Sequence, residues 1–244
     1  SAFLSMTTSA TLVAAAALGA VFALLSGLVI MRTTSLTLLM LTVAFSQILL
    51  QLANKANWLT GGDDGLYGYT VAPVLGLFEF DYLGRVGYLY ALIVAVVVYG
   101  IVRHIVRSPL GLTCRGIRTQ RRRMGALGEP VRGTLVTVYV IGGALAGIAG
   151  AVSSQTAGVV SLNSLSFILS AEGLVMLVLG GLTRPLGAVL GTVTFMVVHH
   201  VSAGIDPYNW MFAIGLMLIL VMLFLPGGLV EIADRAVKLA RRSK

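Results

Sequence analysis

The chain has 244 residues, of which 57% are hydrophobic and 11% are charged. Soluble domains have roughly 45–50% apolar and roughly 25% charged residues, so this chain has too few charges for a water-facing surface. Its mean hydropathy is +0.95. Runs without a charged residue recur at 1–31, 33–54, 86–102, 133–171, 185–205 and 207–230. The composition therefore predicts an all-α, polytopic membrane protein and excludes a soluble enzyme, a disordered chain and a disulfide-stapled secreted module.

Seven membrane segments are expected, because most of these runs reach the roughly 20 apolar residues that cross a bilayer. They lie at 10–30, 34–53, 86–102, 134–153, 167–183, 186–203 and 209–226. A further apolar stretch at 70–78 is too short to cross, so we interpret it as an interfacial or re-entrant piece. Residues 1–244 are expected to form a single transmembrane domain.

The basic residues predict an orientation for these segments. Of the 17 Lys and Arg residues, 13 lie in two stretches, 103–132 and 235–244. Cytoplasmic loops of membrane proteins carry such an excess. With 103–132 inside, 15 of the 17 are cytoplasmic and only Lys55 and Arg85 are outside. The N-terminus is then outside and 227–244 is a basic cytoplasmic tail. Nucleic acid is not an expected partner, because the charges form no stripe on a globular face.

Glycines spaced four residues apart occur in two of the expected segments. Gly143 and Gly147 lie in the run GGALAGIAGA, and Gly187 and Gly191 follow Pro185. Small residues at this spacing let transmembrane helices approach closely. We therefore expect these four glycines to lie at helix contacts.

The fifth and sixth segments are joined by a short stretch that contains Gly180, Gly181 and Arg184–Pro185. A tight cytoplasmic turn is favoured there, and a broken helix that lines a transport pathway is the alternative. Glu172 is the one acidic residue within the expected segments. A carboxylate in a membrane segment indicates a partner or an aqueous face. An interfacial carboxylate that reaches water is an equally good interpretation.

Motifs for nucleotide or metal chemistry are missing from the sequence. It contains no G-x-x-x-x-G-K-[ST] phosphate loop and no G-x-G pair. The single cysteine, Cys114, excludes an intramolecular disulfide and a cysteine-based metal site. His199 and His200 are adjacent, so they cannot face one site on a helix. An enzyme is therefore disfavoured, and neither a cofactor nor a metal is expected.

The loop 103–132 contains the most informative pattern. Ser108–Pro109 is a typical helix start, because proline at the first helical position loses no needed hydrogen bond. Apolar residues then recur on one side and arginines on the other: Cys114, Ile117, Met124 and Leu127 against Arg115, Arg118, Arg122 and Arg123. One interpretation is an interfacial helix whose arginines hold topology and touch anionic lipid. The other is a docking helix for a soluble partner.

Four motifs occur in the order in which a known family has them. They are LTGGDDGL (59–66), GLTCRGIRTQRRRMGALG (111–128) with the GGALAGIAGA run after it, SAEGLVMLVLGGLTRPLGAVLG (170–191) and FLPGGL (224–229). Together they resemble the permeases of branched-chain amino acid ABC importers, the LivM type. Family members usually begin with further membrane segments, which this chain is expected to lack. In this chain 119–121 (Thr-Gln-Arg) replaces a section that is usually acidic in the family, which makes the loop unusually basic. The 183–185 stretch (Thr-Arg-Pro) also departs from the family's turn.

The resemblance implies a membrane subunit of a binding-protein-dependent importer in a bacterial inner membrane. Its partners would be a second homologous permease, two ATPase subunits that hydrolyse ATP, and a periplasmic binding protein. The resemblance implies that an ATPase-coupling helix comprises Gly111, Arg115, Ile117, Arg118, Met124, Leu127 and Gly128. It also implies that Glu172, Gly180 and Gly181 lie beside the translocation pathway.

Hydrophobic amino acids are the expected substrates, with urea, short amides and small aromatic acids as alternatives for a related importer. Two other classes of function stay open. An ATP-independent secondary carrier usually needs ionisable residues inside the membrane, and only Glu172 meets this requirement. A purely structural membrane subunit is the third class.

Overall fold

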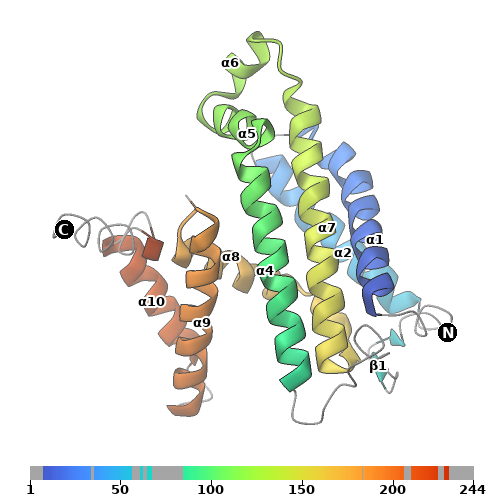
Figure 1. Cartoon of the computed structure of the whole chain (residues 1–244), viewed down its shortest axis with the longest axis vertical. Coiled ribbons are helices and arrows are strands. Elements are labelled where there is room, and N and C mark those ends of the chain that lie inside the picture. Colours follow the sequence, from blue (N-terminus) through green and yellow to red (C-terminus); the bar gives the residue numbers. More distant parts are fainter. Residues whose placement is uncertain are drawn as a thin grey trace. The chain divides into compact units, whose positions relative to one another are not determined.

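The computed structural model describes residues 8–33, 36–56, 61–62, 65–67, 85–182, 184–205, 210–224 and 228–230. This part of the chain consists of helices and one two-stranded ribbon, which confirms the predicted all-α, polytopic architecture (Figure 1). The chain forms two compact units, Ser1–Ser166 and Phe167–Lys244. The predicted piece at 70–78 and most of the predicted tail lie outside the described residues.

Every predicted membrane segment overlaps one helix over most of its described length. The first unit holds α1 (Thr8–Ile30), α2 (Leu36–Lys55), α4 (Arg85–Arg107) and α7 (Val131–Ala157), and the second holds α8 (Phe167–Gly180), α9 (Pro185–Ile205) and α10 (Trp210–Phe224). Among the described residues, α1, α2, α4, α7 and α9 are long and apolar enough to cross a membrane.

The helices α8 and α10 are apolar but shorter, with 14 and 15 residues. At 1.5 Å per residue each is about 22 Å long, less than the roughly 30 Å of a hydrocarbon core. Five crossings are therefore supported by helix length, and crossing by α8 and α10 stays a prediction.

The first unit is centred on α1 and α7, which lie side by side (Figure 1). A methyl group added to Gly143 would meet Gly19 and Ala23 of α1, and one added to Gly147 would meet the backbone of Ala15. The two helix backbones thus touch without a layer of side chains between them. Close backbone approach of this kind holds helices together in lipid, where burial of apolar side chains gives no advantage.

A small ribbon lies at the end of the first unit where α7 finishes. The helix ends at Gly158, whose left-handed backbone (φ 65°) lets its N–H reach the Ser154 carbonyl. Strand β2 (Val159–Val160) follows and pairs antiparallel with β1 (Leu66–Tyr67). Next comes the short helix η2 (Leu162–Leu165), which contacts α2.

The second unit is a hairpin of α8 and α9, with α10 packed against both. Its closest contact is between glycines. A methyl group on Gly180 would meet the backbone of Gly187 and Gly191, and Gly181 has a φ of 103° at the turn. Gly228 packs against the same turn, since a methyl group there would lie 2.5 Å from the Gly181 backbone.

Candidate functional site

The end of the first unit opposite the ribbon holds two short helices, α5 (Pro109–Thr119) and α6 (Arg121–Ala126) (Figure 1). A single residue, Ser108, separates α4 from α5. Pro109 occupies the first helical position as predicted, and the Ser108 hydroxyl donates a 2.7 Å hydrogen bond to the Ile105 carbonyl of α4. The joint therefore gives α5 no linker in which it could move independently of α4.

Gly111 makes this sharp corner possible. A methyl group on Gly111 would meet the Val106 carbonyl and would lie 2.9 Å from the Ile105 oxygen. Both are backbone atoms, which cannot move aside as a flexible side chain does. The first turn of α5 thus rests directly on the last turns of α4.

The single helix expected over 111–128 is two helices in the structure. Gln120 has an extended backbone (φ −150°, ψ 89°) that ends α5 and begins α6. Met124 folds back onto α5, with its sulfur 2.7 Å from the place of a methyl group on Gly116. The absent side chain at Gly116 leaves the space that Met124 fills.

Helix α6 ends in a Schellman motif. Gly128 has a φ of +87°, its N–H donates to the Gly125 carbonyl, and the Glu129 N–H donates to the Met124 carbonyl. A left-handed residue at this position favours glycine, because it has no Cβ to clash. Gly128 thus sets the direction in which the chain returns to α7.

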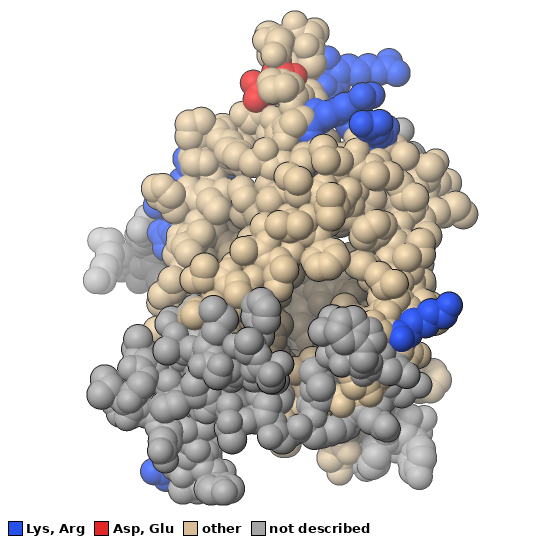
Figure 2. Space-filling model, turned by 90° about the vertical axis from the view of Figure 1, so that its right-hand side faces the viewer, with Lys and Arg blue, Asp and Glu red and all other residues tan. Residues whose placement is uncertain are grey.

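The basic side chains of this end are exposed. Figure 2 shows several Lys and Arg side chains near the top of the view, where α5 and α6 lie in Figure 1, and others along the flanks. The exposed arginines of α5 and α6 are Arg115, Arg118, Arg121, Arg122 and Arg123. We name these five the arginine cluster. Its members are separated in sequence by only a few residues, so their charges add to a concentrated positive potential.

The predicted apolar ridge is divided between the interior and the surface. Ile117 is 7% exposed and packs inside the unit, while Leu127 is 74% exposed. Met124 and Cys114 are half-buried. Burial raises the pKa of the Cys114 thiol. Leu112 of α5 is 62% exposed, so Leu112 and Leu127 offer a partner two large, strongly exposed apolar side chains.

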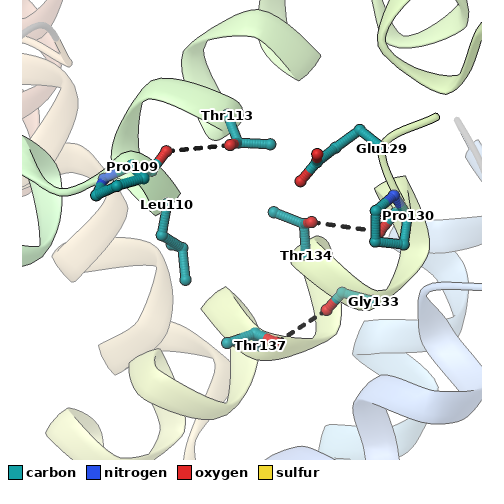
Figure 3. Close-up of a pocket in the computed structure, with 8 residues that line it drawn as sticks. All are labelled: Pro109, Leu110, Thr113, Glu129, Pro130, Gly133, Thr134 and Thr137. Carbon is teal, nitrogen blue, oxygen red and sulfur yellow. Dashed lines mark hydrogen bonds between the residues drawn. The ribbon is translucent and has the colours of Figure 1, made fainter. Parts of the chain in front are cut away.

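A hollow of about 470 Å³ lies between the first turn of α5 and the first turns of α7 (Figure 3). It is lined by Pro109, Leu110, Thr113, Glu129, Pro130, Gly133, Thr134 and Thr137. The Glu129 carboxylate and the Thr113 and Thr134 side chains point towards its centre. The threonine hydroxyls donate to carbonyls of their own helices, at 3.0 Å for Thr113 and 3.2 Å for Thr134. Among the described residues no group of three His, Cys, Asp or Glu could hold a metal ion.

A polar network that the sequence analysis missed joins three helices at the other end of the unit. The Tyr90 hydroxyl of α4 donates a hydrogen bond to Gln155 Oε1 of α7, and Gln155 Nε2 donates one to Thr11 Oγ1 of α1. Each donor–acceptor distance is 2.6 Å. Gln155 is 8% exposed. The signal that could have found it is an amide in the charge-free run 133–171, just past the predicted segment 134–153, since an amide at a membrane helix needs a partner.

Comparison with known proteins decides the family. The family model described as the permease component of the branched-chain amino acid transport system matches residues 1–222. The chain belongs to this permease family. It is a multi-pass membrane protein, and the resemblance seen in the sequence motifs is confirmed. No solved structure matches the chain.

Three curated relatives carry branched-chain amino acid transport in their names. The high-affinity permease proteins LivM of Escherichia coli and of Salmonella typhimurium are each 27% identical to 88% of this chain. BraD of Pseudomonas aeruginosa is 32% identical over 55% of the chain and 44% of its own length. The chain spans about half the length of the relatives, 55% for both LivM proteins.

The remaining predicted residues of this permease lie in the second unit. Glu172 is half-buried near the start of α8, while Gly180 and Gly181 are buried at the turn between α8 and α9. Gly187 and Gly191 lie against that turn. Each of the four glycines predicted at helix contacts thus has a neighbouring helix backbone within van der Waals reach. Glu172 lies eight residues before Gly180 on α8, or about 12 Å along the helix axis, so the structure does not join it and the turn glycines in one site.

Proposed function

We propose that this chain is the membrane-spanning subunit of an importer of branched-chain and other hydrophobic amino acids. Its membership of the permease family supports the transport of small molecules across a membrane. The names of the LivM and BraD relatives support the substrate class. Because the sequence has no phosphate loop, the energy of ATP hydrolysis would reach it through contact with separate ATPase subunits.

The observation that carries this proposal is the α4–α5 corner. The arginine cluster is exposed on α5 and α6, and Leu127 is exposed directly after α6, so both can meet a soluble subunit. The one-residue joint at Ser108 and the contact at Gly111 make α4 and α5 mechanically continuous. A push on α5 by an ATPase would therefore tilt α4, which is how rigid elements pass a conformational change between sites.

The proposed assembly contains this chain, a second homologous permease, two ATPase subunits and a periplasmic substrate-binding protein. It would lie in the inner membrane of a bacterium, with α5 and α6 in the cytoplasm. The exposed arginines support this orientation, because basic residues concentrate on the cytoplasmic side. The substrate-binding protein would then meet the opposite end, where the ribbon of β1 and β2 lies.

Co-purification of ATPase subunits, with leucine uptake by cells, tests the proposal. Leu127→Ala removes an exposed apolar side chain from the proposed ATPase-docking surface, which consists of the arginine cluster and Leu127. Truncation of an interface anchor costs about 2 kcal/mol, or roughly a thirtyfold loss of affinity. Leu89→Ala is the control, because Leu89 is 56% exposed on α4 near the end opposite α5. Retention of the ATPase by Leu127→Ala, or absence of any ATPase with the parent chain, contradicts the proposal.

A further inference from the structure

Helix α2 differs from the other long helices of the first unit. None of its residues is buried, and its main contacts among the described elements are with α1 and η2. It contains no glycine, whereas the α1–α7 and α8–α9 contacts are made through glycines. One face of α2 is therefore open, and it lacks the small residues with which this chain packs its helices.

Three side-chain amides lie on that open face. Gln47, Gln51 and Asn54 are spaced i, i+4 and i+7, so they share one face of the helix. Gln47 and Gln51 are exposed and Asn54 is half-buried. We name these three residues the amide ladder.

The amide ladder lies within the depth of the hydrocarbon core. Taking α2 as a span centred on its midpoint, Gln47 is about 2 Å, Gln51 about 8 Å and Asn54 about 13 Å from the centre. The half-thickness of the hydrocarbon core is about 15 Å. An amide that faces lipid at this depth forfeits its hydrogen bonds, which is unfavourable. The face must then meet water or another polar surface.

Helix α4 is a comparison within the same unit. Apart from Tyr88 near its start, the large exposed side chains along its span are aliphatic: Leu89, Leu92, Ile93, Val96, Val97 and Ile101. On α2 the neighbours of the ladder, Ile48 and Leu52, are 63% and 62% exposed and have the same apolar character. The ladder is thus a polar stripe beside an apolar face on one helix.

We infer that the amide ladder of α2 forms part of the wall of the water-filled translocation pathway. The inference rests on the proposed function. In the predicted orientation α2 ends outside, so the ladder leads from the outer boundary to the middle of the membrane. The amides both donate and accept hydrogen bonds, which suits the carboxylate and ammonium groups of an amino acid. Beyond Gln47 the same face continues with exposed Val43 and Met40, against which an aliphatic side chain can pack.

Cysteine accessibility in the assembled transporter tests this inference. Single cysteines replace Gln47, Gln51, Ile48 or Leu52 in a Cys114→Ser background, and vesicles of both orientations receive a charged methanethiosulfonate reagent with and without ATP. We expect Gln47→Cys and Gln51→Cys to react at least tenfold faster than Ile48→Cys and Leu52→Cys. Equal rates at all four positions would overturn the inference. A second result would also overturn it: the cysteines at 47 and 51 react in the isolated chain but are protected in the assembled transporter. That result would assign this face of α2 to a contact with another subunit.

Leucine uptake provides a second readout. Gln47→Leu with Gln51→Leu keeps side-chain volume and removes both amides, and Ile48→Leu with Leu52→Ile is the matched control. We expect the first variant to lose at least tenfold in uptake rate at parental abundance and with the ATPase still bound, and the control to change less than twofold. Unchanged uptake by the first variant overturns the inference. Failure of the parent chain to bind an ATPase or import leucine would instead refute the proposed function, and the labelling pattern can still be measured.

Discussion

Tyr90 of α4 and Gln155 of α7 share a 2.6 Å hydrogen bond, although 65 residues separate them in the chain. Gln155 passes the connection on to Thr11 of α1 through its amide nitrogen. One buried amide thus joins three membrane helices at the end away from α5. The opposite end of α4 is fixed to α5 at the Ser108 joint. A tilt of α4 driven from α5 would therefore act against this network.

Tyr90→Phe is expected to destabilise the first unit, because it leaves Gln155 Oε1 buried without its donor. Hydrogen bonds between membrane helices are worth about 0.6 kcal/mol on average and up to about 1.7 kcal/mol. Thermal unfolding in detergent measures the effect. Tyr88→Phe is the control, since Tyr88 is 68% exposed on the same helix. Equal midpoints for the two variants would show that the network contributes nothing to stability.

Gly147→Ala is expected to separate α1 from α7. The added methyl group would lie against the Ala15 carbonyl, at 2.9 Å from its carbon, and overpacking of this kind costs about 1–3 kcal/mol. Gly150→Ala is a matched control on the same helix, because nothing lies within 4 Å of the added carbon. That control should be neutral or should stabilise the helix by up to about 1 kcal/mol. Similar losses in both variants would contradict a specific contact at Gly147.

The helices could be predicted from the sequence because each apolar run is long and bounded by charged or turn-forming residues. Two features of the α5–α6 region could not be predicted from the sequence. The break at Gln120 falls inside a run without proline, and it lets Met124 fill the space above Gly116. The burial of Ile117 depends on how α5 lies against α4 and α7. Helical spacing places Ile117 and Leu127 together, but the break turns only Ile117 inwards.

The partners of Gln155 could not be predicted from the sequence for a related reason. Gln155 bonds to residues that are 65 and 144 positions away, and no local pattern identifies such partners. The glycine contacts were easier to predict, because a Gly-x-x-x-Gly pattern indicates a face of small residues whichever helix packs against it. The pattern at 143–147 did not reveal that α1 is the partner. Local spacing identifies a face, and only the fold identifies its neighbour.

Cys114 provides a test of orientation and of burial together. Its pKa is raised by burial, so at pH 7.5 a smaller fraction is thiolate than in a free cysteine, whose pKa is about 8.5. Because the thiolate is the nucleophile, labelling by a maleimide should be slower than at Leu127→Cys, made in a Cys114→Ser background. As the pH is raised, the labelling rate of Cys114 should continue to increase after the labelling rate at position 127 has reached its plateau. In intact cells an impermeant reagent should label Asp64→Cys in that background and leave Cys114 of the parent unlabelled. Labelling of Cys114 from outside would reverse the predicted topology.

Gly111→Ala is expected to uncouple the ATPase from the spans without preventing membrane insertion. The added methyl group would lie 2.6 Å from the Val106 carbonyl carbon and 2.9 Å from the Ile105 oxygen, so α5 must move away from the end of α4. The docking residues Leu127 and Arg118 would then be displaced relative to the spans, although their own chemistry is unchanged. Leucine uptake should fall at least tenfold at parental abundance in the membrane. Gly125→Ala on α6 is the control, because nothing lies within 4 Å of its added carbon, and it should stay within twofold of the parent. Uptake by Gly111→Ala at the level of that control would show that the corner transmits no movement, and the energy would have to enter the permease elsewhere.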